Sequence, residues 1–169
     1  MKLTALYQIF QECQSVTTDS RNCPDGSLFI ALKGESFNGN AFAKLALDSG
    51  CAYAIVDEAE YAVEGDRRYI LVDDCLQTMQ QLANERRRQL GTRVIGITGT
   101  NGKTTTKELI SSVLCKAHNV LYTSGNLNNH IGVPTTLLRL KPEHDLAVIE
   151  MGANHQGEIK FLCGIAERD

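Results

Sequence analysis

Long apolar runs are absent from this sequence of 169 residues. A helix that spans a membrane needs roughly 18 or more consecutive apolar residues, and no segment approaches that length. The N-terminal segment MKLTALYQIFQEC is amphipathic, but it has neither the apolar run nor the small-residue cleavage site of an export signal. The sequence therefore predicts neither export nor a membrane span.

Paired cysteine motifs are absent as well. The 6 cysteines are spread along the chain without a Cys-x-x-Cys pair, and several of them stand in apolar surroundings. A free thiol in such surroundings behaves as a small hydrophobe, and this usage is typical of a reducing compartment. We therefore expect a cytoplasmic protein.

A strong charge of either sign is also missing, since the formal net charge is −3. The basic residues are scattered, except for Arg86-Arg87-Arg88, which lies in a helical pattern and is more simply a solvated face. Nucleic-acid binding is therefore not expected. Hydrophobic residues make up 43% and charged residues 22% of the chain, which is typical of a globular protein rather than a disordered or fibrous one.

What is present is an alternation of short apolar strands with helical patterns, divided near Gly91. Before this glycine we expect helices at 3–11, 40–50 and 74–90 and strands at 28–32, 52–56 and 69–72. After it we expect strands from 93, at 120–122 and at 146–149, and helices at 104–118, near Pro134 and at the C-terminus. Such alternation predicts an α/β fold with parallel sheets: a small domain over 1–90 and a second domain over 91–169.

The segment GITGTNGKTTTKELI follows the apolar residues Val94 and Ile95. A strand that breaks at a glycine turn and enters a helix presents unpaired N–H groups and the positive end of the helix dipole, which together bind phosphate. The usual pattern G-x-x-x-x-G-K-[ST] would place glycine at Ile97, so the spacing here is shorter.

The parts of a phosphate site are nevertheless present in this shorter loop. Gly99 and Gly102 let the backbone curl toward phosphates, Lys103 can lie over their oxygens, and the Thr104 hydroxyl can ligate Mg²⁺. The alternative is a plain glycine turn in which threonines cap the helix.

Other polar residues stand where ligands gather. Glu150 follows the predicted strand 146–149 at its carboxyl end, although a carboxylate in such a place is more often solvated. The amides of Asn126, Asn128 and Asn129 can donate to phosphate or substrate oxygens, or can simply form turns. We favour Asn126 and Asn129 as site residues. His155 could contact phosphate, water or a metal, or face solvent at a helix N-terminus.

Three separated segments resemble the Mur ligase family. They are TGTNGKTTTKE (98–108), TSGNLNNHIGVPTTLL (123–138) and IEMGANHQGEI (149–159). Residues 16–42 resemble the UDP-sugar-binding domain of the same family. Many members have Asp-Gly-His where this chain has Asn38-Gly39-Asn40, so no ligand contact is expected there.

The resemblance implies an ATP-dependent ligase of the bacterial cytoplasm that joins D-alanyl-D-alanine to UDP-MurNAc-tripeptide during peptidoglycan synthesis. It implies Mg²⁺ ligands at Thr104 and Glu150 and catalytic roles for Lys103, Asn126, Asn129 and His155. ATP is then expected at Gly99, Thr100, Asn101, Gly102, Lys103, Thr104 and Thr105. The UDP moiety is expected at Thr18, Asp19, Ser20 and Arg21, whose groups can read uracil, ribose and pyrophosphate. Without the resemblance, a turn with a surface arginine would be preferred.

Family members have three domains, so the resemblance also implies that this chain is an inactive N-terminal fragment of a monomeric enzyme. The missing parts would be the rest of the ATPase sheet, a carbamylated lysine and a C-terminal domain. We expect exposed sheet edges to let the fragment self-associate. The alternatives are another P-loop enzyme, such as a small kinase or a folylpolyglutamate synthase-like ligase, and a non-catalytic UDP-sugar-binding module.

Overall fold

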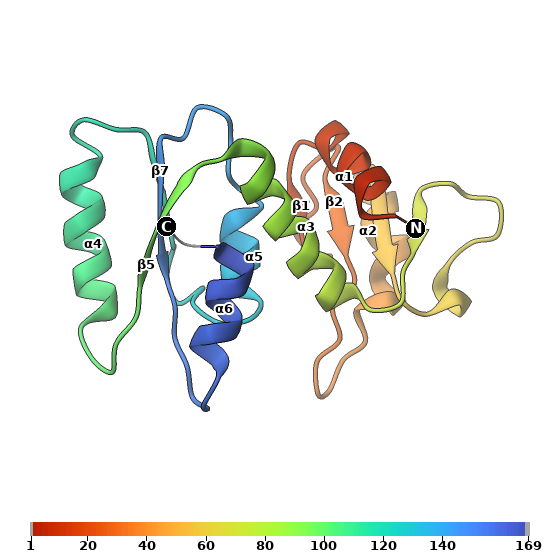
Figure 1. Cartoon of the computed structure of the whole chain (residues 1–169). Coiled ribbons are helices and arrows are strands. Elements are labelled where there is room, and N and C mark those ends of the chain that lie inside the picture. The colour runs from red at the N-terminus through yellow and green to blue at the C-terminus, as the bar shows by residue number, and fades with distance from the viewer. Residues whose placement is uncertain (1, 168–169) are drawn as a thin grey trace. The chain divides into compact units, whose positions relative to one another are not determined.

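The computed structural model describes residues 2–167, which form two compact units, one up to Met79 and the other from Gln80 (Figure 1). Each unit is built on its own parallel sheet, so the predicted α/β fold class is confirmed. Met1 and residues 168–169, which the predicted domains include, lie outside the described residues. No helix within residues 2–167 is long and apolar enough to cross a membrane.

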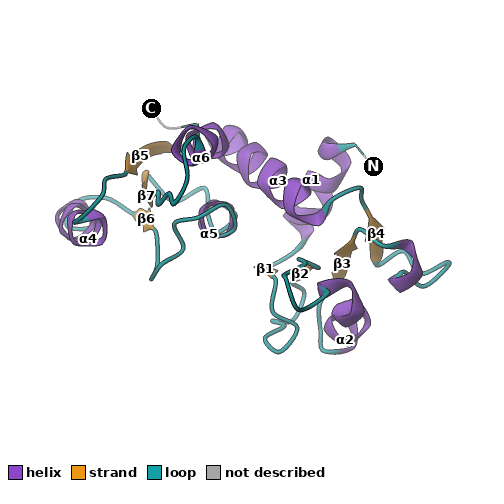
Figure 2. Ribbon diagram, turned by 90° about the horizontal axis from the view of Figure 1, so that it is seen from below, coloured by secondary structure: helices purple, strands orange, loops and turns teal. Residues whose placement is uncertain are grey.

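The first unit contains a four-stranded parallel sheet in the order β1-β2-β3-β4. Its elements are α1 (Leu3–Glu12), β1 (Val16–Thr17), β2 (Leu28–Ile30), η1 (Gly39–Phe42), α2 (Ala43–Asp48), β3 (Tyr53–Val56), η2 (Ala59–Tyr61), β4 (Tyr69–Leu71) and the start of α3 (Cys75–Leu90). Helix α2 covers one face of the sheet and α1 lies on the other (Figure 2). Strands β2 and β3 are covered on both faces, which explains their continuous apolar sequences.

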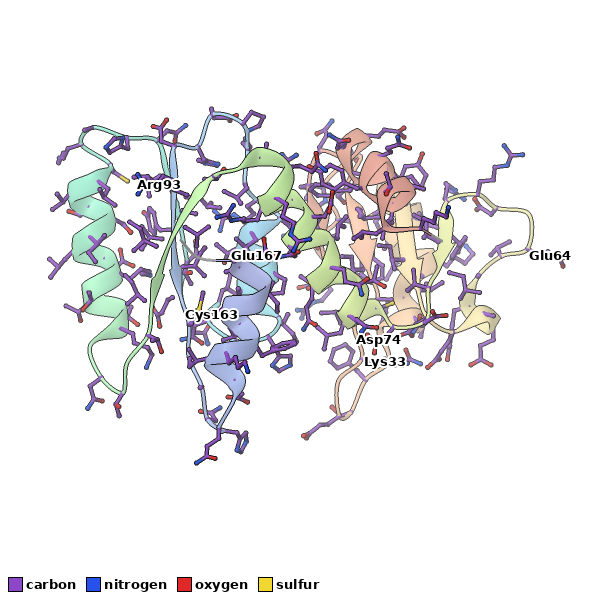
Figure 3. All side chains as sticks on the ribbon, in the orientation of Figure 1. Lys33, Glu64, Asp74, Arg93, Cys163 and Glu167 are labelled. Atoms are coloured by element: carbon purple, nitrogen blue, oxygen red, sulfur yellow. The ribbon has the colours of Figure 1, made fainter. Side chains whose placement is uncertain are left out.

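The buried carboxylate of Asp57, directly after β3, connects three segments of the first unit. The Asp57 side chain is only 5% exposed, and its Oδ1 lies 3.1 Å from Lys33 Nζ. Lys33 is labelled in Figure 3. The Asp57 carboxylate also accepts hydrogen bonds from Asn40 Nδ2 at 2.8 Å and from the Cys75 N–H at 3.1 Å, where α3 begins. Burial acts to raise the pKa of Asp57, but these donors outweigh it, so the pKa lies below its ordinary value. Asn40 therefore has a structural partner.

We expect Asp57→Ala to lower the free energy of unfolding by about 3 kcal/mol near pH 7, because it leaves the buried Asn40 amide and the Cys75 N–H without their acceptor. A carboxyl whose pKa is depressed in the folded state stabilises the fold above its unfolded pKa of about 3.9. That contribution is lost as the pH falls through the folded pKa. Urea unfolding of the wild type and the variant from pH 7 to pH 3 measures both effects.

The matched control is Asp48→Ala, which removes an exposed carboxylate that pairs with Lys44. We expect it to change stability little, since exposed ion pairs contribute little. A stability difference between Asp57→Ala and the wild type that stays the same from pH 7 to pH 3 would contradict the role given to the Asp57 charge.

The second unit contains a three-stranded parallel sheet in the order β5-β7-β6. Its elements, besides the later part of α3, are β5 (Arg93–Ile97), α4 (Lys103–Leu114), β6 (Val120–Tyr122), α5 (Gly132–Leu137), β7 (Leu146–Glu150) and α6 (Glu158–Ala166). Helix α4 packs on one face of the sheet, and α5 and α6 pack on the other (Figure 2). The last strand in sequence, β7, is therefore the central and most buried strand.

The later part of α3 is fastened to the second unit. Asn84 Nδ2 donates to the Ile165 carbonyl at 2.9 Å, and Arg86 Nε donates to the Leu140 carbonyl at 3.0 Å. Arg88 forms an ion pair with Glu167. The compact units thus divide within α3, whereas the sequence analysis expects the domains to divide near Gly91. Arg86 and Arg88, which were expected on a solvated face, both contact other parts of the protein.

Two element boundaries differ from the sequence prediction. The helix predicted at 104–118 ends at Leu114, because the N–H groups of Lys116 and Ala117 turn to carbonyls three residues earlier and tighten the chain. Glu150 is the last residue of β7 rather than the residue that follows it, and its backbone pairs with Ile97. This pairing carries the Glu150 side chain to the same edge of the sheet as the end of β5.

Candidate functional site

The glycine-rich loop connects the end of β5 at Ile97 to the start of α4 at Lys103. Gly102 has φ +77°, a left-handed conformation that glycine adopts without strain. Lys103 Nζ donates to the Gly99 carbonyl at 2.7 Å, so the ammonium lies over the loop. The residues predicted to bind the nucleotide, 99–105, accordingly form one loop and the first turn of one helix.

Glu150 lies buried beside this loop, with only 1% of the residue exposed. Its Oε1 accepts hydrogen bonds from Thr104 Oγ1 at 3.2 Å and from Asn128 Nδ2 at 2.9 Å. Its Oε2 is buried and has no hydrogen-bond partner among the described residues. A buried carboxylate oxygen without a partner is unfavourable by itself, and a cation is the usual means of satisfying it.

The loop of asparagines lies between β6 and α5. The Asn129 carbonyl oxygen Oδ1 accepts from the N–H groups of Ile131 and Gly132, at 3.1 and 2.8 Å. A side chain on Gly132 would come within 2.3 Å of the Leu127 backbone, so only glycine lets the loop pass this closely. Asn129 thus shapes the loop, while Asn128, which the sequence analysis did not favour, reaches Glu150.

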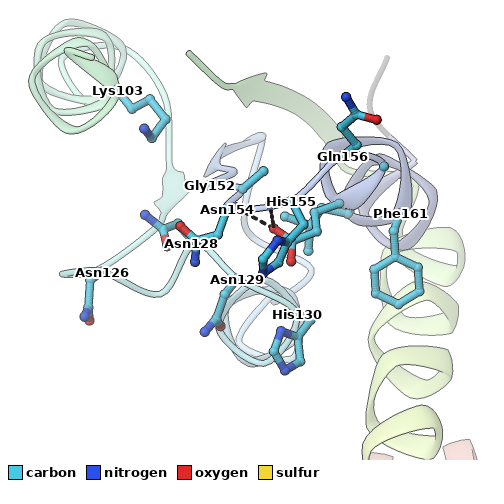
Figure 4. Close-up of a pocket in the computed structure, with 14 residues that line it drawn as sticks. Lys103, Asn126, Asn128, Asn129, His130, Gly152, Asn154, His155, Gln156 and Phe161 are labelled. Atoms are coloured by element: carbon cyan, nitrogen blue, oxygen red, sulfur yellow. Dashed lines mark hydrogen bonds between the residues drawn. The ribbon is translucent and has the colours of Figure 1, made fainter. Parts of the chain in front are cut away.

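The backbone of the segment after β7 is fixed by hydrogen bonds to the Glu158 side chain. Its Oε2 accepts hydrogen bonds from the N–H groups of Asn154 and His155, at 2.6 and 3.1 Å (Figure 4). These two donors, Asn154 first, hold the pKa of the Glu158 carboxyl below its ordinary value. Glu158, the first residue of α6, therefore fixes the turn that precedes the helix, and His155 lies in this turn.

These segments surround a pocket of about 790 Å³ within the second unit (Figure 4). Its lining contains one lysine, several amides, two histidines and one carboxylate, with an apolar wall from α6. The lining residues are Lys103, Asn126, Asn128, Asn129, His130, Gly152, Ala153, Asn154, His155, Gln156, Gly157, Glu158, Phe161 and Leu162. All four residues predicted to be catalytic, Lys103, Asn126, Asn129 and His155, are among them.

The second predicted site lies in the first unit, after β1. The Asp19 carboxylate accepts from Arg21 Nε and Nη2, both at 2.8 Å, and the Arg21 side chain is 86% exposed. These hydrogen bonds from Arg21 lower the pKa of Asp19 to about 2. Thr18 is exposed and Ser20 is half-buried. Asp66 and Arg68 form the same kind of pair elsewhere, so this geometry alone does not mark a binding site.

Comparison with known families decides what kind of chain carries these features. The sequence model of the Mur ligase middle domain matches residues 97–169, and that of the Mur ligase family, catalytic domain, matches residues 12–87. The chain belongs to the Mur ligase family. The predicted family membership is thereby confirmed, and the two matches together take in both sites described above.

Two curated proteins similar to this Mur ligase chain share one name. UDP-N-acetylmuramoyl-tripeptide--D-alanyl-D-alanine ligase of Bacillus subtilis is 46% identical over 154 residues, which are 91% of this chain and 34% of the relative. The ligase of the same name from Escherichia coli is 48% identical over 151 residues, 89% of this chain and 33% of the relative. The chain thus spans about a third of the length of these curated relatives.

Solved structures show the same likeness. MurF from Acinetobacter baumannii has a TM-score of 0.87 and 38% identity, over 99% of this chain and 38% of that one. The MurF ligase from Thermotoga maritima in complex with ADP has a TM-score of 0.81 and 32% identity, over 93% of this chain and 36% of that one.

Proposed function

We propose that this chain supplies the UDP-substrate-binding and ATP-binding parts of a ligase that joins D-alanyl-D-alanine to UDP-MurNAc-tripeptide. The observation that carries the proposal is the buried Glu150 carboxylate, which has one oxygen without a partner beside Thr104 and the phosphate loop. The named relatives and their ADP complex support the substrate class. The proposal concerns a whole ligase, of which residues 1–90 would hold the UDP substrate and residues 91–169 the first part of the ATP-binding domain.

The residues around Glu150 fit a bound Mg²⁺. Thr104 offers a hydroxyl and Glu150 a carboxylate, which are the oxygen ligands that Mg²⁺ prefers. Residues 2–167 contain no cluster of three His, Cys, Asp or Glu side chains placed to hold a metal. Mg²⁺ commonly binds through one or two carboxylates together with substrate phosphates, so such a cluster is not required. When bound, the ion would offset the negative charge of the phosphoryl group being transferred.

The proposed reaction has two steps. The tripeptide carboxylate attacks the γ-phosphorus of ATP, ADP leaves and an acyl phosphate forms. The amine of D-alanyl-D-alanine then attacks the acyl carbon and gives up a proton, and phosphate leaves as the amide forms. The first step brings two anions together, and the second develops negative charge on the acyl oxygen, so the site must stabilise negative charge as it develops.

The residues of the pocket suit this task. Lys103 extends from the phosphate loop and can exchange the Gly99 carbonyl for a phosphate oxygen. Asn126 lines the pocket and can donate to the acyl phosphate without adding charge. His155 lines the same pocket from the segment between β7 and α6. Asn129 acts mainly by shaping the loop that carries Asn126. We further propose that such a ligase acts in the bacterial cytoplasm as a monomer.

Titration of the chain with UDP-MurNAc-tripeptide and with ADP plus Mg²⁺ tests the proposal. We expect the two ligands to bind independently, one in each unit. Failure to bind UDP-MurNAc-tripeptide, with ADP binding retained, would favour an unrelated P-loop enzyme. The reverse result would favour a non-catalytic sugar-nucleotide module.

Arg21→Ala is expected to weaken binding of UDP-MurNAc-tripeptide by about tenfold or more, since a charged hydrogen bond to pyrophosphate is lost. Binding of ADP with Mg²⁺ should stay unchanged, because Arg21 lies in the first unit. Calorimetric titration of both ligands measures the two effects. The matched control is Arg68→Ala, which removes an exposed arginine paired to Asp66 in the same way. Equal weakening by both variants would show a general charge effect and contradict a UDP site at Arg21.

A further inference from the structure

Lys107 is a fully buried lysine on α4, one turn after Lys103. Its side chain is 0% exposed, and its Nζ donates to the Thr123 carbonyl at 2.7 Å. The same ammonium pairs with Glu108 Oε1 at 2.7 Å and lies 5.9 Å from the centre of the Tyr122 ring. Removing an ammonium from water is unfavourable unless its partners are well placed. The hydrogen bond to Thr123 and the ion pair with Glu108 supply such partners for Lys107.

Thr123 links Lys107 to Glu150 through hydrogen bonds. It is fully buried directly after β6, and its N–H donates to the Val148 carbonyl at 3.1 Å. Its hydroxyl oxygen accepts from the Glu150 N–H at 2.9 Å. The Glu150 carboxylate then accepts from Thr104, which lies on the same helix as Lys107. The hydrogen bonds therefore form a closed circuit from α4 through Thr123 and Glu150 back to α4.

We propose that Lys107 is a positioning residue for the metal-binding carboxylate. Its buried ammonium sets the distance between α4 and the ends of β6 and β7, and so holds Glu150 against Thr104. This inference rests on the proposed function, because it takes Glu150 to be a Mg²⁺ ligand. In this proposal Lys107 acts on Glu150 through Thr123, whose carbonyl accepts from its ammonium.

Stability alone does not explain a lysine at this place. Apolar side chains of similar length fill buried positions at least as favourably, and replacing buried charges by them is often neutral or stabilising. An apolar side chain cannot, however, donate to the Thr123 carbonyl and fix the end of β6. Residues that orient metal ligands from behind typically change metal affinity by about 10- to 100-fold when they are replaced.

The test is a Mg²⁺ titration at fixed ADP, followed by calorimetry on the 169-residue chain. In Lys107→Met we expect the Mg²⁺ concentration at half-saturation to rise about 10- to 100-fold. ADP binding in the presence of EDTA should change less than about twofold, because Lys103 and the loop glycines remain. A merely structural lysine would alter the melting temperature and leave this Mg²⁺ dependence unchanged.

Ser111→Ala is the matched control, since Ser111 is buried one turn further along α4 and its hydroxyl has no hydrogen-bond partner among the described residues. We expect it to leave the Mg²⁺ dependence as in the wild type. Thr123→Val is the second variant, because it removes the acceptor of the Glu150 N–H without touching Lys107. It should raise the Mg²⁺ requirement in the same direction, and the double variant should be little worse than either single one.

A wild-type Mg²⁺ requirement in folded Lys107→Met would overturn the inference. If Lys107→Met does not fold, Thr123→Val decides alone, and an unchanged Mg²⁺ requirement in that variant overturns it. The proposed function fails separately, when the wild-type chain itself binds ADP no better with Mg²⁺ than with EDTA. In that case the inference falls with it.

Discussion

Lys103→Ala is expected to lower kcat of the proposed full-length ligase by about a hundredfold or more while the fold stays intact. The lysine ammonium lies over the phosphate loop, where it contacts only backbone carbonyls, so its removal leaves no buried partner unsatisfied. Removing one cation or donor from the developing charge of a phosphoryl transfer costs on the order of several kcal/mol of transition-state stabilisation. Phosphate release that depends on UDP-MurNAc-tripeptide and D-alanyl-D-alanine measures the loss.

The control for this variant is Lys116→Ala, which removes an exposed lysine just beyond the end of the same helix. We expect wild-type turnover in the control, because long-range charge effects at an exposed site are screened. Wild-type turnover in Lys103→Ala would remove Lys103 from the site.

Glu150→Gln is expected to abolish the Mg²⁺ dependence of nucleotide binding without unfolding the protein. The amide keeps the size of the side chain but replaces a negative oxygen with a neutral group, so the affinity for Mg²⁺ should fall by at least about a hundredfold. The buried carboxylate has an oxygen without a partner in the described part of the chain, and neutralising it relieves an unfavourable buried charge. The melting temperature without ligand should therefore stay equal or rise.

Parallel measurements of Mg²⁺-dependent ADP binding and of thermal unfolding separate these effects. Glu158→Gln serves as the comparison, since Glu158 is a carboxylate that lines the nearby pocket and is satisfied by two backbone donors. It should retain the Mg²⁺ dependence. A normal Mg²⁺ dependence in Glu150→Gln, or a loss of folding in that variant, would contradict a metal-binding role for Glu150.

Much of the fold was predictable because it depends on local sequence. Strands β2, β3 and β7 are covered on both faces and therefore appear as continuous apolar runs. The strand 120–122 was predicted with its observed bounds. The end of α4 was misplaced, because the tightened turn after Leu114 leaves the helical pattern of residues 115–118 intact. Residues 80–90 belong to the second compact unit, and a helix pattern does not reveal which core its side chains join. The domain boundary near Gly91 stays a prediction.

The site was predictable only in part, for a similar reason. Gly99, Gly102 and Lys103 could be singled out because they are contiguous and the loop geometry follows from neighbouring residues; their role in binding phosphate stays a prediction. Asn128 was passed over in favour of Asn126 and Asn129, since three asparagines in one loop look alike until the loop is closed by Gly132. The functional roles of Asn126, Asn129 and His155 stay predictions.

The sequence by itself determined the α/β class, the family and the glycine-rich loop between a strand and a helix, because each of these is a property of neighbouring residues or of a recognisable order of segments. Only the tertiary structure decided the surroundings of Glu150. The order β5-β7-β6 inserts the last strand between the two earlier ones, and the carboxyl ends of parallel strands then meet at one edge of the sheet. That insertion brings Thr104 of α4 and Asn128 to the Glu150 carboxylate, and Thr123 to the Glu150 backbone N–H. Strand order depends on long-range packing, which spacing along the chain does not record.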